Sequence, residues 1–269
     1  MTSLVTTPAK VGDLLREWRQ RRRFSQLDLA SEAEVSTRHL SFVETGRAAP
    51  SRDMLLRLAE RLDVPLRARN ELLQAGGFAA IYAERPLQAP EMTVARRTVE
   101  TVLAAHAPFP ALAIDRHWTL VTANAAVPPL LAGVAAHLLE PPVNVLRLSL
   151  HPEGLAPRIA NLGEWRAHLL ARVQGQVDGT GDNVLRALRS ELAAYPFTAS
   201  PTRPGNFAGI AVPFRLCVPG LPEPLSFIST TTVFGTPVDV TLSELALECF
   251  YPADETTRMT LIGQGAPGV

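Results

Sequence analysis

The stretch QLDLASEAEVSTRHLSFVE, residues 26–44, decides the fold of the N-terminal part of the chain. Ser25 directly precedes one helical pattern and Ser36 precedes a second, so both serine hydroxyls are placed to cap helix N-termini. A small residue, Ala30, stands where two such helices would cross. The positions that would pin both helices to a core are all apolar: Leu29, Ala33, Val35, Leu40 and Val43. The stretch therefore predicts two short helices joined by a tight turn.

Three further helices surround this pair. The spacing of Leu14, Leu15 and Trp18 predicts a helix over 11–22, before the pair. Ser51 begins a helix that runs to about Leu62, and another follows Pro65 and ends at residues 76–77, which are both glycine. Gly46 is placed to end the second helix of the pair. We expect residues 10–77 to form a compact five-helix unit.

The second helix of the pair turns a polar face outward. This face is short, combines polar, basic and aromatic side chains and is rich in hydrogen-bond donors, which suits the major groove of DNA. Its residues are Ser36, Thr37, Arg38, Ser41 and Phe42, with His39 at the edge. The alternative is a plain helical bundle whose polar face is only solvated.

Here the sequence resembles the repressor-like (XRE-type) helix-turn-helix regulators, over about residues 10–77. The resemblance rests on SQLDLA in the first helix of the pair, ETGR at 44–47 and Pro50-Ser51 before LLRLAERLDV. It implies binding of double-stranded DNA, with Gln26 on a phosphate and Arg47 on the DNA backbone. Thr37, Arg38, Ser41 and Phe42 match base-facing positions, and Arg19, Arg22 and Arg23 could supply further phosphate contacts. One departure is Glu34, because many such motifs place glycine in this turn; we expect a turn geometry that avoids a left-handed residue.

The pattern of the chain changes after this unit. We expect a disordered arm at 1–9, a helix-turn-helix domain at 10–80, a linker at 81–92 and a second domain at 93–269. Helical patterns cover 92–106, 124–139, 161–175 and 182–194, and strand-like runs cover 111–124, 208–218, 225–234 and 240–251. The fold class predicted is therefore an all-α domain followed by an α+β domain with a mainly antiparallel sheet.

Residues 111–131 look like the opening of a PAS-type domain, with Asn124 as the N-cap of a helix. With STRHLSFVETGR, RNELLQAGGFA and NVLRLSLHPEGLAPRIANLGEW (144–165), the chain resembles the MmyB-like regulators. That resemblance implies a PAS-like domain that holds a small apolar molecule, such as a fatty acid. Ligand-contact candidates are Trp165, Leu169, Val173 and Leu188, with His151, Arg158 and Arg166 to anchor a carboxylate. The alternatives are that the apolar stripes are core, that the three basic residues are structural, and that the domain only dimerises.

Composition limits the remaining possibilities. The formal net charge of the chain is zero, but residues 1–80 hold 13 basic and 10 acidic side chains. Cys217 and Cys249 are expected as buried apolar residues, not as disulfide or zinc ligands. We find no catalytic motif, no metal-ligand spacing among the six histidines, no cofactor motif, no signal peptide and no membrane span. We therefore expect a cytoplasmic, non-enzymatic regulator that binds a palindromic operator as a homodimer.

Overall fold

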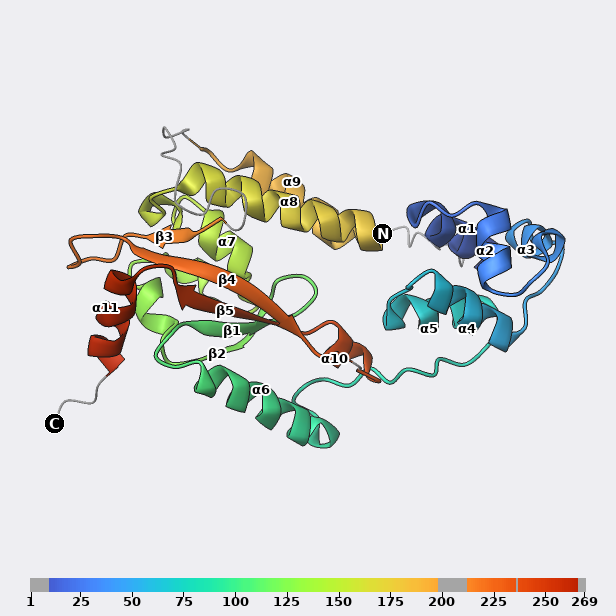
Figure 1. Ribbon diagram of the computed structural model, residues 1–269, viewed down its shortest axis with the longest axis horizontal. Coiled ribbons are helices and arrows are strands. Elements are labelled where there is room, and N and C mark those ends of the chain that lie inside the picture. Colours follow the sequence, from blue (N-terminus) through green and yellow to red (C-terminus); the bar gives the residue numbers. More distant parts are fainter. Residues whose placement is uncertain (1–9, 198–211, 236, 266–269) are drawn as a thin grey trace, which may run out of the picture. The chain divides into compact units, whose positions relative to one another are not determined.

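The computed structural model describes residues 10–197, 212–235 and 237–265, so the arm predicted at 1–9 lies outside it. The chain divides into two compact units (Figure 1). A helical unit runs up to Arg85 and also includes Asp178–Thr180 and Pro237–Ser243. The other residues form an α+β unit. No helix among the described residues is long and apolar enough to cross a membrane.

Five α-helices build the helical unit, as predicted: α1 (Val11–Arg21), α2 (Gln26–Glu32), α3 (Thr37–Glu44), α4 (Arg52–Arg61) and α5 (Leu66–Ala75). The three predicted serine caps are confirmed. Ser25, Ser36 and Ser51 each accept a hydrogen bond from the backbone amide three residues later. In α2, Asp28 returns a bond to the amide of Ser25 and completes a capping box.

The crossing of α1 and α3 is very close. A Cβ atom added at Gly12 would lie 2.3 Å from the carbonyl oxygen of Val43, so glycine is needed there. The turn between α2 and α3 places Glu34 at φ 55°, in the left-handed region. The expectation that this turn avoids a left-handed residue is therefore wrong. Gly46, just beyond α3, has φ 73° and supplies the predicted helix stop.

The segment after α5 is fastened to that helix. The side-chain amide of Asn70 accepts from the backbone amides of Ile81 and Tyr82 and donates to the carbonyl of Tyr82. Arg67 pairs with Glu84 at 2.6 Å. Within the same unit, Arg85 contacts Asp239 at 3.2 Å. The first half of the predicted linker is thus tied down, and η1 (Pro90–Met92) then leads into α6 (Thr93–Ala105).

A five-stranded antiparallel sheet organises the α+β unit. Its order is β2 (Leu120–Ala123), β1 (Ala111–Ile114), β5 (Ala246–Pro252), β4 (Leu225–Val233) and β3 (Phe214–Leu216). All four residues of β1 are buried, and α6 packs against this strand. Figure 1 shows α7 (Val145–Leu150), α8 (Leu162–Thr180) and α9 (Asn183–Ala194) together on one side of the sheet. The main core of the unit lies between these helices and the sheet.

Several predicted elements are wrong in detail. The helix expected at 124–139 is replaced by two short 3-10 turns, η2 (Pro128–Leu131) and η3 (Ala136–Leu138). Two adjacent prolines in this segment lack the amide hydrogens that an α-helix uses. Asn124 therefore caps no α-helix; its side chain instead bonds Ala111, Ala126, Leu103 and Phe109.

The C-terminal third also differs from the expectation. The strand predicted from 240 begins at Ala246, after the short helix α10 (Val240–Ser243). Helices α7 and α11 (Glu255–Gly265) were not predicted. Within the run predicted at 208–218, residues 208–211 lie outside the described part, and β3 shows the expected alternation of buried and exposed residues. Cys249 is buried as expected, but Cys217 is exposed.

Candidate functional site

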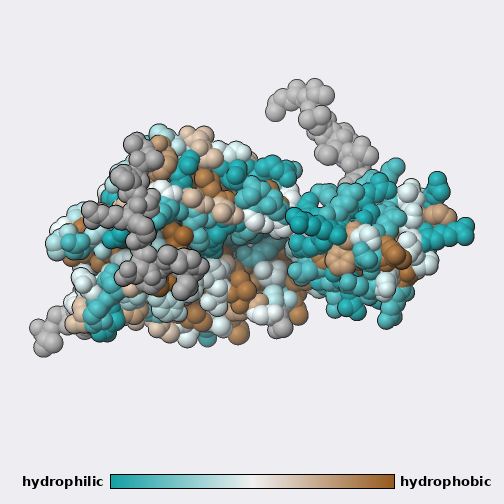
Figure 2. Space-filling view, turned by 45° about the horizontal axis from the view of Figure 1, so that its top comes forward, coloured by the Kyte–Doolittle hydropathy of each residue, from teal (hydrophilic) through white to brown (hydrophobic). Residues whose placement is uncertain are grey.

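Helix α3 presents a row of polar side chains on the helical unit. Leu40 and Val43 have no exposed surface and fix the inner face of the helix. Arg38 and His39 are exposed, and Ser41 and Phe42 are half-buried on the surface. Figure 2 shows mostly hydrophilic colours over this unit, at the right. The outward face predicted from the sequence is therefore present.

Two guanidinium groups lie close to the ring of Phe42. The Cζ atom of Arg38 is 5.3 Å from the centroid of the Phe42 ring, and that of Arg47 is 5.9 Å away. Both distances are within reach of cation–π attraction, which restrains long side chains that would otherwise sample many rotamers. We call these three residues the Arg38–Phe42–Arg47 cluster. The cluster places two positively charged guanidinium groups at one surface of the helical unit.

Glu44, the last residue of α3, is a buried hub that the sequence did not reveal. Its side chain has no exposed surface, and Arg19 donates two hydrogen bonds to it, at 2.7 and 2.8 Å. Gln26 donates a third bond of 2.8 Å. Burial alone would raise the pKa of Glu44, but the bonds from Arg19 and Gln26 and the nearby charges bring this pKa below its ordinary value. The hub joins α1, α2 and α3.

The predicted phosphate-contacting residues fall into two groups. Arg19 and Gln26 belong to the Glu44 hub, and Arg22 donates to the backbone carbonyls of Leu62 and Asp63 at 2.8 Å each. Arg23 and Arg47 are exposed. The hydroxyl of Ser36 accepts from the amide of His39 as a helix cap. Contacts of any of these residues with DNA stay predictions.

The α+β unit contains a cavity of about 100 Å³ between the sheet and the helices. Its wall is almost entirely apolar and is formed by the sheet, by α7 and α8 and by neighbouring turns. The lining residues are Pro110, Leu112, Trp118, Leu120, Val127, Leu130, Leu131, Val145, Leu146, Leu148, Ser149, Leu155, Trp165, Leu169, Arg172, Phe214, Leu216, Phe227, Glu248 and Phe250.

Two charged residues of this wall form one ion pair. Arg172 on α8 meets Glu248 on β5 through contacts of 2.7 and 3.2 Å. Thr231 donates a 2.7 Å bond to Glu248 and accepts a 2.8 Å bond from Arg172. The guanidinium group of Arg172 also lies over the Trp118 ring, with its Cζ atom 4.7 Å from the ring centroid. We call Arg172 and Glu248 the wall ion pair; Thr231 bonds to both of its members.

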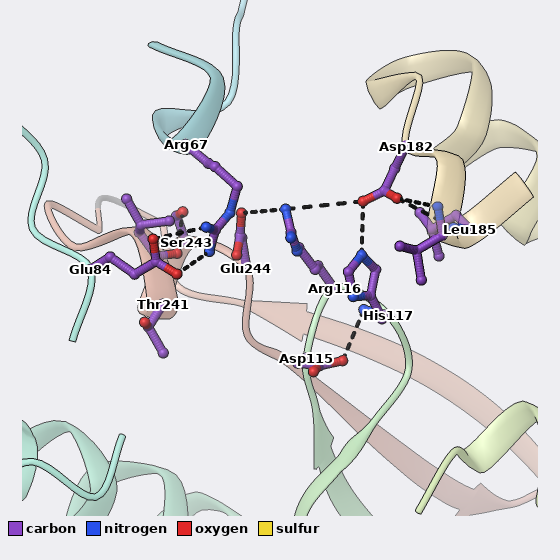
Figure 3. A network of polar contacts seen from close by, with 12 residues as sticks. Arg67, Glu84, Asp115, Arg116, His117, Asp182, Leu185, Thr241, Ser243 and Glu244 are labelled. Carbon is purple, nitrogen blue, oxygen red and sulfur yellow. Dashed lines mark hydrogen bonds and ion pairs between the residues drawn. The ribbon is translucent and has the colours of Figure 1, made fainter. Parts of the chain in front are cut away.

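A polar network fixes the turn that places Trp118 in the wall (Figure 3). Asp115 accepts from the amides of His117 and Thr119, at 2.8 Å each, and Trp118 between them has φ 66°. The ring of His117 is 2.8 Å from Asp182, which caps α9. Burial opposes the ionised form of Asp182, but the bond from His117 and two backbone amides lower its pKa below the ordinary value.

Arg116 extends this network on the other side. Its guanidinium group lies 3.6 Å from Glu244 and 4.0 Å from Asp182 (Figure 3). The turn between β1 and β2 is thus tied both to the N-terminus of α9 and to the residue that follows α10. Trp118 is thus held both in the core of the unit and in the wall of the cavity.

The sequence identified part of this wall. Trp165 and Leu169 line the cavity as proposed, whereas Val173 and Leu188 are buried in the surrounding core and do not line it. Arg158 donates to the carbonyls of Leu130, Ala132 and Cys217, and Arg166 donates to carbonyls at the end of α9. None of the three proposed carboxylate anchors, His151, Arg158 and Arg166, lines the cavity.

The wall residues missed by the sequence analysis carried a weak signal. Arg172 follows Leu169 by three positions, so it continues the same stripe of α8. Glu248 shares one face of β5 with Ala246 and Phe250, so it is a charged residue between two apolar ones. A charged residue in each of two inward-facing patterns indicates an ion pair, but a separation of 76 positions along the chain hides which residues pair.

A second cluster could hold a metal ion. His137, His151 and Glu153 offer ligand atoms that all lie within 4.8 Å of one another, although the sequence showed only scattered histidines. Two histidines and a carboxylate are a ligand set that zinc accepts. However, Nδ1 of His151 already accepts a 3.1 Å bond from the amide of Glu153, so a metal at that atom would have to displace it.

Comparisons with known proteins agree with both units. Residues 15–68 match the helix-turn-helix family, and residues 95–261 match the MmyB-like transcription regulator ligand binding domain. A curated relative from Methanoculleus marisnigri, named "Putative HTH-type transcriptional regulatory protein", is 39% identical over 117 residues. The match covers 42% of this chain and 37% of that relative, so it spans well under two thirds of the relative's length.

Among solved structures, an RNA-binding light-oxygen-voltage receptor shares 16% identity with this chain at a TM-score of 0.27. That match covers 96% of this chain and 63% of the receptor. The family matches carry the assignment, because the ligand-binding-domain family covers more than half of the chain. The protein therefore belongs to the MmyB-like transcription regulators, with a helix-turn-helix unit ahead of the ligand-binding domain.

Proposed function

We propose that this regulator reads double-stranded DNA by inserting α3 into the major groove. In this proposal Thr37, Arg38, Ser41 and Phe42 face base edges; within the Arg38–Phe42–Arg47 cluster, Arg38 and Phe42 read bases and Arg47 reaches a phosphate. Arg38 is placed to donate to a guanine, which is the commonest specific contact of arginine, and Phe42 to contact a thymine methyl group. Ser36 and His39 lie at the N-terminal edge of the same face.

Phosphate contacts would frame this reading helix. Arg23 and Arg47 are the exposed cations for that role. Gln26 and Arg19 would act mainly by holding α1, α2 and α3 together, and Arg22 by tying the end of α1 to the end of α4. The test is operator selection from random DNA followed by binding measurements on single variants. Arg38→Ala should lose about 1–3 kcal/mol of discrimination at one base pair. The exposed Arg61→Ala on α4 is the matched control and should bind normally.

We further propose that the C-terminal domain binds a small apolar ligand with an acyl chain, of which a fatty acid is one example. The observation that carries this proposal is the cavity, because its wall is almost wholly apolar. Its volume of about 100 Å³ is below the roughly 150 Å³ of an engineered cavity that holds benzene. An acyl chain can therefore enter only when part of the wall moves.

The wall segment best suited to move is η2 with its neighbours. Leu130 and Leu131 belong to the short 3-10 turn η2 and Val127 directly precedes it, whereas most of the other wall residues lie on α7, α8 and the sheet. Arg158 holds this segment through the carbonyls of Leu130 and Ala132. A ligand that binds the widened form better shifts the population toward it, which is the requirement for coupling to DNA binding.

Native mass spectrometry of the purified full-length protein, with lipid extraction, tests the binding. The wild type should retain or take up an acyl compound, and Leu169→Glu should abolish this by placing a charge in the wall. Val184→Glu on α9, where the valine is 54% exposed, is the control and should bind like the wild type. Unchanged uptake by Leu169→Glu would rule out this cavity as the binding site.

A second candidate function for the C-terminal domain is dimerisation. Val94 and Val102 of α6 are exposed although they are apolar, at 78% and 40% of their surfaces. They lie eight residues apart and so share one face of the helix. In this proposal α6 contributes to a homodimer that binds a palindromic operator. Dimerisation and ligand binding are compatible.

A further inference from the structure

The two charged side chains in the cavity wall neutralise each other. Among the described residues that line the cavity, the charged ones are Arg172 and Glu248. Their contact is bidentate, at 2.7 and 3.2 Å, and the side chain of Glu248 is only 5% exposed. The wall therefore contributes no net charge to the cavity.

Arg172 has few directions left in which to meet a ligand. Glu248 and Thr231 take hydrogen bonds from its two terminal nitrogens, and the Trp118 ring covers one face of the guanidinium group. Trp118 is itself fixed, because its indole nitrogen donates a 2.7 Å bond to Gln176. A ligand carboxylate would have to displace Glu248 and leave that buried carboxylate without its partner.

Basic residues near the cavity do not replace Arg172. Arg158 and Arg166 donate to backbone carbonyls, and neither lines the wall, although the second terminal nitrogen of Arg158 has no hydrogen-bond partner among the described residues. His168 stacks on Trp165 with ring centroids 5.4 Å apart. Burial, together with the charge of Arg172, lowers the pKa of His168, so this ring is neutral at physiological pH.

Ser149 offers the wall a hydrogen-bond donor that carries no charge. It lies on α7, lines the cavity and is 9% exposed. Its hydroxyl oxygen accepts a 2.9 Å bond from the indole nitrogen of Trp165. In the described part of the chain no protein acceptor takes the hydroxyl proton, so it can be donated to a ligand oxygen.

Resting on the proposed acyl-binding function, we propose that the cavity selects an uncharged acyl compound with a hydrogen-bond acceptor, such as an ester, ketone or lactone, over a carboxylate. The chain of such a compound fills the apolar wall, and its carbonyl oxygen accepts from Ser149. A carboxylate inside the cavity disrupts the wall ion pair. Because breaking a buried ion pair is strongly unfavourable, we expect a penalty of at least about tenfold in affinity.

The experiment measures how probes compete with the neutral fluorophore N-phenylnaphthylamine for the full-length protein. The probes are dodecane, methyl dodecanoate and dodecanoic acid, at about pH 8 where a free carboxylic acid is ionised. The wild type should bind the ester at least about tenfold more tightly than the acid. Equal or tighter binding of the acid overturns the inference. Failure of all three probes, dodecane included, overturns the proposed acyl-binding function and the inference with it.

Three variants add an independent test of the mechanism. Glu248→Gln keeps the shape of the side chain but leaves Arg172 uncompensated, so it should reverse the preference toward the acid. Ser149→Ala should weaken the ester and leave dodecane unchanged. Glu191→Gln is the matched control, because Glu191 pairs with Arg147 at 2.7 Å outside the cavity wall; its ester preference should equal that of the wild type. If Glu248→Gln does not fold, as judged by circular dichroism, the wild-type comparison and Ser149→Ala still decide.

Discussion

The Glu44 hub predicts a large loss of stability when its charge is removed. In Glu44→Gln the amide keeps one oxygen for Arg19, but its NH₂ group would face the NH₂ group of Gln26 or the guanidinium group. Glu44 has no exposed side-chain surface and Arg19 is 12% exposed, so solvent screens little of the loss. Breaking one partner of such a buried pair costs about 3–5 kcal/mol. We expect about 3 kcal/mol, because Arg19 retains its bond to the carbonyl of Phe24.

This loss would be a large fraction of the free energy that holds a small domain together, which is about 5–15 kcal/mol. It corresponds to a fall of roughly 12–24 °C in the melting temperature of the helical unit. Hydrogen exchange of the full-length protein is the assay, because it reports peptides of α1–α3 separately from the α+β unit. The exposed Glu60→Gln on α4 is the control and should change stability by less than about 0.5 kcal/mol.

The pH dependence gives the same prediction a second readout. The folded-state pKa of Glu44 is depressed, so its contribution is fully present above the unfolded-state pKa and is lost as the pH falls through the folded-state pKa. The stability difference between the wild type and Glu44→Gln should therefore shrink in acid, below about pH 4. Unchanged exchange in α1–α3 at neutral pH, or a difference that grows in acid, would refute the reasoning.

Three further predictions follow from the helical unit and from α6. Arg47→Ala should weaken binding to all DNA sequences alike and flatten the plot of log affinity against log salt by about 0.9, the value of one phosphate contact; a loss confined to the operator would place Arg47 on a base instead. Glu34→Gly should leave the fold intact and stabilise the helical unit in urea by up to about 1 kcal/mol, because it relieves a left-handed residue at φ 55°; a destabilised variant would mean that the Glu34 side chain makes a favourable contact that outweighs the strain. Sedimentation should show a homodimer, whose two copies of α3 would reach half-sites about 34 Å apart. The double variant Val94→Glu with Val102→Glu should shift the protein toward monomer. A wild-type monomer that binds a single half-site tightly would exclude this arrangement.

Local chemistry explains why the helical unit was predictable. Serine caps, a glycine stop and apolar spacing act within a few residues, so Ser25, Ser36, Ser51 and Gly46 mark their helices correctly in the sequence. Where two prolines interrupt an apolar pattern, as at 128–129, the missing amide hydrogens override the spacing and the expected helix does not form.

Long-range pairing explains what the sequence could not predict. Arg19 and Glu44 are 25 residues apart, and Arg172 and Glu248 are 76 apart, so neither pair is visible as a local pattern. For the same reason Arg158 was expected to meet a ligand, although its Nε and one terminal nitrogen donate to three carbonyls from distant segments. The apolar wall was predictable in kind, but its boundary between lining residues and ordinary core depends on the packing of the whole unit.

The assignment of Pro237–Ser243 to the helical unit has a consequence for synthesis on the ribosome. The amide of Val240 donates to the carbonyl of Ala83, and Asp239 meets Arg85, yet roughly 150 residues separate these partners in the chain. At about 5–20 residues per second, α1–α5 are synthesised some 8–30 s before this segment. The nascent helical unit must therefore exist at first without this segment. A chain that ends before residue 237 would have a helical unit that lacks these contacts.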